Sequence, residues 1–181
     1  MTAQAVHNLN LLLGFGSLIL LAISLILILM LLFVPKRNGV LDFVHQNFLL
    51  LGFLAAFSAS LFSLVYSEIV NFAPCYLCWL ARIFMFPMAI IFGVALYYKD
   101  RGVTKYIIAL LAPAFAVSLY HNFMQYFADT GNLPCDASGV SCYQSLIPEF
   151  GGHLQIPTLS LISLIALLSI VLVAHFYKKE A

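Results

Sequence analysis

The sequence contains very little charge. Only 8% of its 181 residues are Asp, Glu, Lys or Arg, whereas 64% are hydrophobic. An ordinary soluble domain carries about 25% charged residues, so this composition excludes that class and indicates an integral membrane protein that contacts membrane lipid. The net charge of +1 gives no indication of a nucleic-acid partner, and none is expected.

The chain also lacks the length for a large extramembrane domain, so a single membrane bundle is expected. Five apolar runs reach the roughly 20 residues that a helix needs to cross a bilayer. They extend over about 11–34, 47–66, 77–98, 106–127 and 156–177. The first run ends at a basic pair and has no convincing cleavage site after it, so we interpret it as a retained helix rather than a secretory signal.

Basic residues are few and fall in blocks between these runs. All but one lie on the same side of a five-span arrangement, whereas the opposite segments carry acidic residues. The basic blocks are Lys36 and Arg37, then Lys99, Arg101 and Lys105, then Lys178 and Lys179. The positive-inside rule therefore predicts an N-terminus outside, a C-terminus inside and every cysteine in an outer loop.

The most informative stretch is Cys75-Tyr76-Leu77-Cys78, followed within an apolar run by Arg82. Positions four apart share one face of a helix, so Cys78 and Arg82 are expected to point toward the same space near the membrane surface. A charged side chain near the centre of a membrane span costs roughly 2.5 to 3.5 kcal/mol, so Arg82 is expected to have a partner or a chemical function. Because a helix start and a nearby cation lower the pKa of a thiol, we predict a redox disulfide that faces a membrane-soluble electron acceptor.

Cysteine is scarce, and the four cysteines form two pairs, Cys75 with Cys78 and Cys135 with Cys142. Four cysteines allow three connectivities, and the sequence does not choose among them. The alternatives to redox chemistry are two structural bridges or a zinc site of four thiolates. Neither is favoured, because a CxxC ring closes almost no loop entropy and a second CxxC is absent, so no metal site is predicted.

Together the two pairs can act as a relay on the oxidising side of the membrane. A reduced partner protein would attack the Cys135/Cys142 disulfide, and the resulting dithiol would reduce Cys75/Cys78, each step passing through a mixed disulfide. The electrons must then leave to a two-electron acceptor that dissolves in the membrane, which describes a quinone.

Three polar residues are candidates for contact with that acceptor. Arg82 would stabilise negative charge that develops on a quinone oxygen. His121 and Gln125 lie four apart, on one face of the fourth run, and would supply further polar contacts or a proton.

These residues resemble the bacterial membrane disulfide oxidases of the DsbB/BdbC family. The resemblance covers roughly residues 45 to 177, and the short spacing of the second pair, together with Cys78-Trp79, is more similar to the BdbC branch. The residues that carry it are Pro74, Cys75, Cys78, Arg82, His121, Gln125, Cys135, Cys142, Pro148, Glu149, Phe150, Ile156 and Pro157.

The resemblance implies a protein-disulfide:quinone oxidoreductase of the bacterial inner (cytoplasmic) membrane, with its cysteine loops on the periplasmic or extracytoplasmic side. Such an enzyme reoxidises a DsbA-like thiol oxidase of the thioredoxin fold and passes the electrons to ubiquinone or menaquinone. By the same resemblance, Arg82 and His121 lie at the quinone.

The resemblance also implies roles for the individual cysteines. Cys78 would be the thiolate next to the quinone, and Cys135 the sulfur joined to the active-site cysteine of the partner. An inter-loop intermediate between Cys75 and Cys142 is implied as well.

One departure from the family pattern concerns the first run, because the family has a four-helix core. We therefore predict an all-α membrane protein with five spans, a four-helix transmembrane bundle plus one extra N-terminal transmembrane helix. Residues 1–40 would form the extra helix and a basic cytoplasmic turn, and residues 41–181 the redox bundle with its two outer cysteine loops.

Two alternative functions remain. A vitamin K epoxide reductase-like protein is also a helical bundle with a CxxC and a quinone, but that family carries its loop cysteines before the CxxC, whereas the order is reversed here. The other alternative is a non-enzymatic membrane subunit with loops stapled by disulfides.

Overall fold

The computed structural model describes residues 3–33, 38–127, 150–152 and 154–177, and within them the chain is helical without a strand. Five helices are long and apolar enough to cross a membrane, which confirms the predicted five-span all-α class. In chain order the elements are α1 Ala3–Phe33, α2 Gly39–Leu64, the π-helical turn η1 Val65–Ile69, α3 Tyr76–Tyr98, the 3-10 turn η2 Arg101–Val103, α4 Thr104–Phe127 and α5 Ile156–Phe176.

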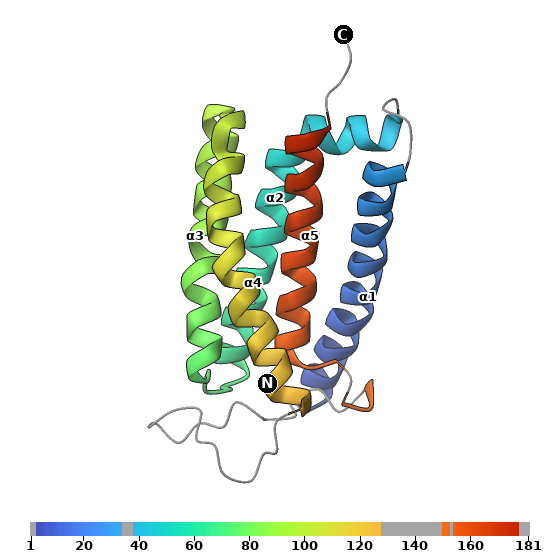
Figure 1. Cartoon of the computed structure of the whole chain (residues 1–181). Coiled ribbons are helices and arrows are strands. Elements are labelled where there is room, and N and C mark those ends of the chain that lie inside the picture. Colours follow the sequence, from blue (N-terminus) through green and yellow to red (C-terminus); the bar gives the residue numbers. More distant parts are fainter. Residues whose placement is uncertain (1–2, 34–37, 128–149, 153, 178–181) are drawn as a thin grey trace.

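The first two helices begin about two turns earlier than their apolar runs indicate. Polar residues sustain these added turns: Gln4 donates a hydrogen bond to Asn8 in α1, and Asn38 caps α2 by accepting from the Val40 amide at 2.9 Å. Asp42 in the first turn of α2 is also favourable, because its charge opposes the positive helix end. These first turns of α2 lie across one end of the bundle (Figure 1).

The hydrophobic core lies among α2, α3, α4 and α5. Phe48, Phe92, Ile107 and Leu167 contribute one fully buried side chain from each of these helices. Helix α1 lies outside this core and packs mainly along α5, with little contact to α2 (Figure 1). The chain is therefore a four-helix bundle with one peripheral helix.

The two ends of the bundle differ in the residues that they carry. The N-terminal ends of α1 and α3 lie at the same end, whereas the α3–α4 turn with Lys99, Arg101 and Lys105 lies at the other, beside the end of α5 (Figure 1). Basic residues 36, 37, 178 and 179 fall outside the described residues. The CxxC and the basic turn are thus separated by the length of a helix, and the compartment that each end faces stays a prediction.

Candidate functional site

The CxxC motif forms the start of α3. Cys75 is the N-cap residue, and its sulfur accepts a hydrogen bond from the Cys78 amide at 3.3 Å. The two Sγ atoms lie 2.8 Å apart as free thiols, with Cys75 buried and Cys78 half-buried. A helix N-terminus stabilises negative charge, so the cap position favours a thiolate on Cys75.

His121 reaches the same sulfur from α4. Its ring is buried, and Nε2 lies 3.8 Å from Cys75 Sγ. Hydrogen bonding from the Cys78 thiol, and next from His121, holds the pKa of Cys75 at about 4, although burial acts in the opposite direction. In the dithiol state these contacts favour the thiolate on Cys75, which differs from the thiolate on Cys78 that the family resemblance implies.

A cavity of about 380 Å³ lies beside the dithiol and is lined by residues of all five helices. Its walls are mostly apolar and serine side chains, and Cys78, Arg82 and His121 are the chemically distinctive groups on them. Cys75 does not line the cavity, so the two cysteines differ in position. Cys75 lies behind Cys78, against His121.

Arg82 is buried and is held by neutral partners on α2. Its Nε donates to Ser63 Oγ at 2.9 Å and its Nη2 donates to the Ser63 carbonyl oxygen at 2.7 Å. Its guanidinium carbon also lies 5.2 Å from the centre of the Trp79 ring, which suits a cation–π contact. These partners hold the guanidinium at the cavity. Because they are uncharged, they do not neutralise its positive charge.

The end of α2 is shaped by η1, a π-helical turn that directly follows Ser63 and Leu64. Such turns widen a helix by one residue and occur often at functional sites. Tyr66 and Ser67 of this turn line the cavity together with Ser63. The turn therefore belongs to the wall that faces Arg82.

Two polar atoms near the site have no hydrogen-bond partner among the described residues, Ser118 Oγ and Gln125 Oε1. Ser118 is 2% exposed and lines the cavity. Gln125 is half-buried and is not among the lining residues. The structure therefore groups Cys75, Cys78, Arg82 and His121, whereas contact of Gln125 with an acceptor stays a prediction.

The loop pair Cys135 and Cys142 falls outside the described residues, and so do their predicted pairings and partner contacts. Within the described residues, the ligand atoms of Cys75, Cys78 and His121 lie within 4.8 Å of one another. Two thiolates and an imidazole are ligands that zinc accepts. The same three groups could therefore bind a metal, with a donor set unlike the four-thiolate alternative.

Several residues at the site were missed in the sequence analysis. Ser63 and Ser118 gave no signal there, because serines are common in these helices and only packing brings one of them to Arg82. The cavity also includes Leu13, Gly16, Ser17 and Leu20 of α1. The small residues in this stretch are a signal for close helix packing, and this signal could have pointed to the α1 wall.

A multi-pass helical fold with a CxxC dithiol at a helix start, a buried arginine and an adjoining apolar cavity defines a membrane thiol redox protein. Comparison with known proteins gives the family. A family model described as disulfide bond formation protein DsbB matches residues 45–174. The chain belongs to this disulfide bond formation family, which confirms the resemblance derived from its motifs.

Individual relatives agree with this membership. Disulfide bond formation protein C of Bacillus subtilis is 38% identical over 122 residues, which cover 67% of this chain and 87% of that protein. A probable disulfide formation protein of Deinococcus radiodurans is 33% identical over 129 residues, covering 67% and 84% respectively. No solved structure matches the chain.

Proposed function

We propose that this protein is a membrane disulfide oxidase that reoxidises a DsbA-like thiol oxidase and passes the electrons to a membrane quinone. The observation that carries the proposal is that Cys78 of the dithiol and the buried cation Arg82 line one apolar cavity. Its volume of about 380 Å³ lies within the range of small-molecule sites. Family membership favours this function over the reductase-like and stapled-subunit alternatives.

The electron balance of the proposed cycle requires two disulfides and one acceptor. The partner's dithiol becomes a disulfide as the Cys135/Cys142 disulfide is reduced. The resulting Cys135/Cys142 dithiol is then oxidised again as the Cys75/Cys78 disulfide is reduced. Each exchange passes through a mixed disulfide. A bound quinone supplies the final two-electron, two-proton acceptor, so that Cys75 and Cys78 return to the disulfide.

The two cysteines at the cavity would have different roles in the last step. Cys78 faces the acceptor, whereas Cys75 carries the negative charge of the dithiol and lies 2.8 Å from Cys78. Cys75 would therefore close the disulfide as the electrons leave by way of Cys78. His121, 3.8 Å from Cys75 Sγ, would take part in moving the proton, and Arg82 would favour the negative charge that builds on an acceptor oxygen.

The hydroxyl of Ser118, which has no partner among the described residues, supports the fit of a quinone. Leaving a buried polar group unpaired costs about 1–3 kcal/mol. Ser118 Oγ lies on the cavity, where a quinone carbonyl oxygen could accept its hydrogen bond. An apolar ring with carbonyl oxygens suits a cavity that combines apolar walls, a hydroxyl and a guanidinium.

The location follows from the proposed electron path. We place the protein in the bacterial inner (cytoplasmic) membrane, with the CxxC end on the outer side and the basic turn inside. Residues 1–40 would be an addition to the redox bundle of 41–181, since the family match begins at residue 45.

Purified protein, a reduced thioredoxin-fold thiol oxidase and a short-chain quinone analogue provide the test. We expect the partner to become oxidised and the quinone to be reduced in equal amounts. Cys78→Ser should stop turnover. Unchanged turnover in Cys78→Ser would rule out the proposed electron path.

A zinc site is the second candidate function for the same residues, because the ligand atoms of Cys75, Cys78 and His121 lie within 4.8 Å of one another. It predicts one zinc ion per chain in the purified protein and a loss of thermal stability on chelation. The oxidase proposal predicts a metal-free protein whose Cys75 and Cys78 change between dithiol and disulfide. Metal analysis and thiol counting on one preparation distinguish them.

A further inference from the structure

One wall of the cavity comes from α1, a helix outside the segment that matches the family. Leu13, Gly16, Ser17 and Leu20 line the cavity and recur at the spacing of a single helix face. Across the cavity lie Ser63 of α2 and the reactive residues of α3. The four-helix bundle alone would leave this side without the α1 wall.

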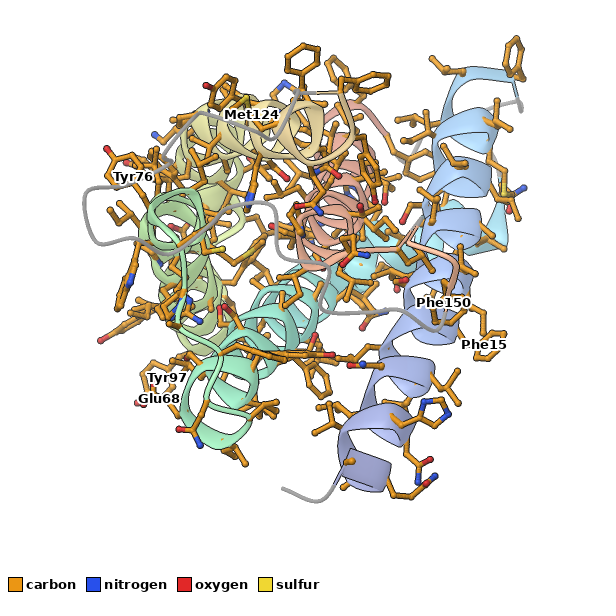
Figure 2. The ribbon with its side chains drawn as sticks, turned by 90° about the horizontal axis from the view of Figure 1, so that it is seen from below. Phe15, Glu68, Tyr76, Tyr97, Met124 and Phe150 are labelled. Atoms are coloured by element: carbon orange, nitrogen blue, oxygen red, sulfur yellow. The ribbon has the colours of Figure 1, made fainter. Side chains whose placement is uncertain are left out.

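Helix α1 is fixed against the bundle at the level of the cavity. Tyr66 donates a hydrogen bond to Asn10 Oδ1, and both side chains are buried. Gly14 packs so closely on Phe150 that a Cβ would have no room, and Phe15 contacts the same ring edge-on at 5.5 Å between centroids (Figure 2). These contacts hold α1 from both sides, toward the end of α2 and toward the segment before α5.

Gly16 is the position at which this wall is thinnest. A Cβ placed there would meet no atom within 4 Å, although the residue lines the cavity. A larger side chain at this position would therefore extend into the cavity without first clashing with the protein. Gly14, only two residues away, differs because its neighbour Phe150 already fills that space.

We infer that α1 is part of the acceptor site: its face of Leu13, Gly16, Ser17 and Leu20 contacts the bound quinone, and Gly16 sets how large a ring system the cavity admits. The buried hydroxyl of Ser118, unpartnered among the described residues and on the same cavity, is an independent indication that a polar ligand atom belongs there. This inference rests on the proposed quinone oxidase function.

The test compares Gly16→Phe with Ala22→Phe, a matched control on the same helix. Ala22 is exposed and does not line the cavity, so the same ring added there would face lipid. The only tryptophan of the chain, Trp79, contacts Arg82, and its fluorescence quenching by a short-chain quinone reports binding without turnover. Quinone reduction is measured in parallel with a benzoquinone and a larger naphthoquinone.

We expect Gly16→Phe to weaken quinone binding by about tenfold, within the range that overpacking a filled site typically produces, with the larger effect on the naphthoquinone. Ala22→Phe should stay within about twofold of the native protein, since it only adds lipid-facing surface. A single turnover in which the oxidised protein oxidises reduced partner without quinone should be equal in all three proteins. Equal quinone binding by the two variants would overturn the inference.

A second variant covers the case in which Gly16→Phe does not fold. Leu20→Ala removes a side chain from the same wall without crowding, and we expect weaker quinone binding with unchanged partner oxidation. Binding unchanged in Leu20→Ala would likewise count against a role of α1. If the native protein neither binds nor reduces quinone, the proposed function itself fails. If the native protein binds quinone and the α1 variants bind it equally well, only the α1 inference fails.

Discussion

Cys75 receives three stabilising contacts on one sulfur atom: the Cys78 amide, the Cys78 thiol and the His121 ring. Each favours the thiolate over the thiol. The cap position supplies the backbone contact, because the first amides of a helix have no partner within the helix. A single residue at a helix start thus becomes the charged member of the pair.

The pH dependence of this thiolate is our first prediction. Because the pKa of Cys75 is held at about 4, the dithiol protein should carry the thiolate above that pH and lose it as the pH falls through 4. The stabilisation of the reduced fold by this charge should decrease as the pH falls below the ordinary thiol pKa of 9.0 and should be gone near pH 4, since a lowered pKa gives stability that is lost on acidification between the unfolded and folded values. Ultraviolet thiolate absorbance, measured with Cys135 and Cys142 replaced by Ser, follows the titration.

Replacing the imidazole tests the cause of the shift. In His121→Leu the midpoint of the Cys75 titration should move to higher pH, because one of the lowering contacts is lost. His175→Leu at the opposite end of the bundle is the matched control and should leave the midpoint in place. A midpoint that is the same in both variants would contradict the assignment of His121 to this thiolate.

Arg82 is the subject of the second prediction. Arg82→Ala should raise the apparent KM for quinone about tenfold or more, because a charge-assisted hydrogen bond contributes about 1.5–3 kcal/mol, while partner oxidation in a single turnover changes less. Ser63→Ala should shift KM in the same direction by a smaller amount, since it removes only the contact to Arg82 Nε. Ser60→Ala is the control, because the Ser60 hydroxyl bonds within its own helix to Ala56. Equal losses in both half-reactions would assign Arg82 to structure instead.

At the scale of elements, the contact between α2 and α3 sets the geometry of the site. Ser63 on α2 and Arg82 on α3 meet only if these helices keep their spacing. Gly52 of α2 lies directly against the buried ring of Phe92 of α3, and a Cβ at Gly52 would overlap that ring. The close approach therefore requires glycine at this position.

The third prediction follows from this approach. Gly52→Val should destabilise the protein by about 1–3 kcal/mol, the usual cost of overpacking a core, and should lower its thermal unfolding temperature in detergent. Gly16→Val is the matched control for stability, because a Cβ there meets nothing within 4 Å. Similar unfolding temperatures for the two variants would show that the helices can separate without cost.

At the scale of the whole molecule, the five helices separate the redox end from the basic end. The N-terminus of α1 and the CxxC share one end (Figure 1), and the basic α3–α4 turn lies at the other. An odd number of spans places the two chain ends on opposite sides of a membrane. The peripheral helix thus changes the side of the N-terminus without moving the cysteines.

Membrane topology is therefore the fourth prediction. A reporter that functions only in the cytoplasm should be active when fused after Ala181 and inactive when fused before Met1, because the basic blocks favour the inner side. A reporter that functions only outside should give the reverse pattern. A C-terminus on the outer side would contradict both the orientation and the proposed path of electrons.

The sequence alone determined the fold class, the five spans, the CxxC with its arginine and the family. These are local properties: an apolar run of sufficient length, a polar interruption and a short spacing each occupy one segment of chain. The starts of α1 and α2 were misplaced because polar residues extend both helices beyond their apolar runs: Asn38 caps α2, and Gln4 donates to Asn8 within the first turns of α1.

Only the tertiary structure decided which of these residues meet. It brought His121 to Cys75, Ser63 to Arg82 and the α1 face to the cavity, and it left Gln125 off the cavity wall. The physical reason is that membrane helices are apolar on every side, so their sequence hardly encodes which face turns inward. Rotation and depth are fixed by close packing at positions such as Gly14 and Gly52 and by a few polar contacts between helices.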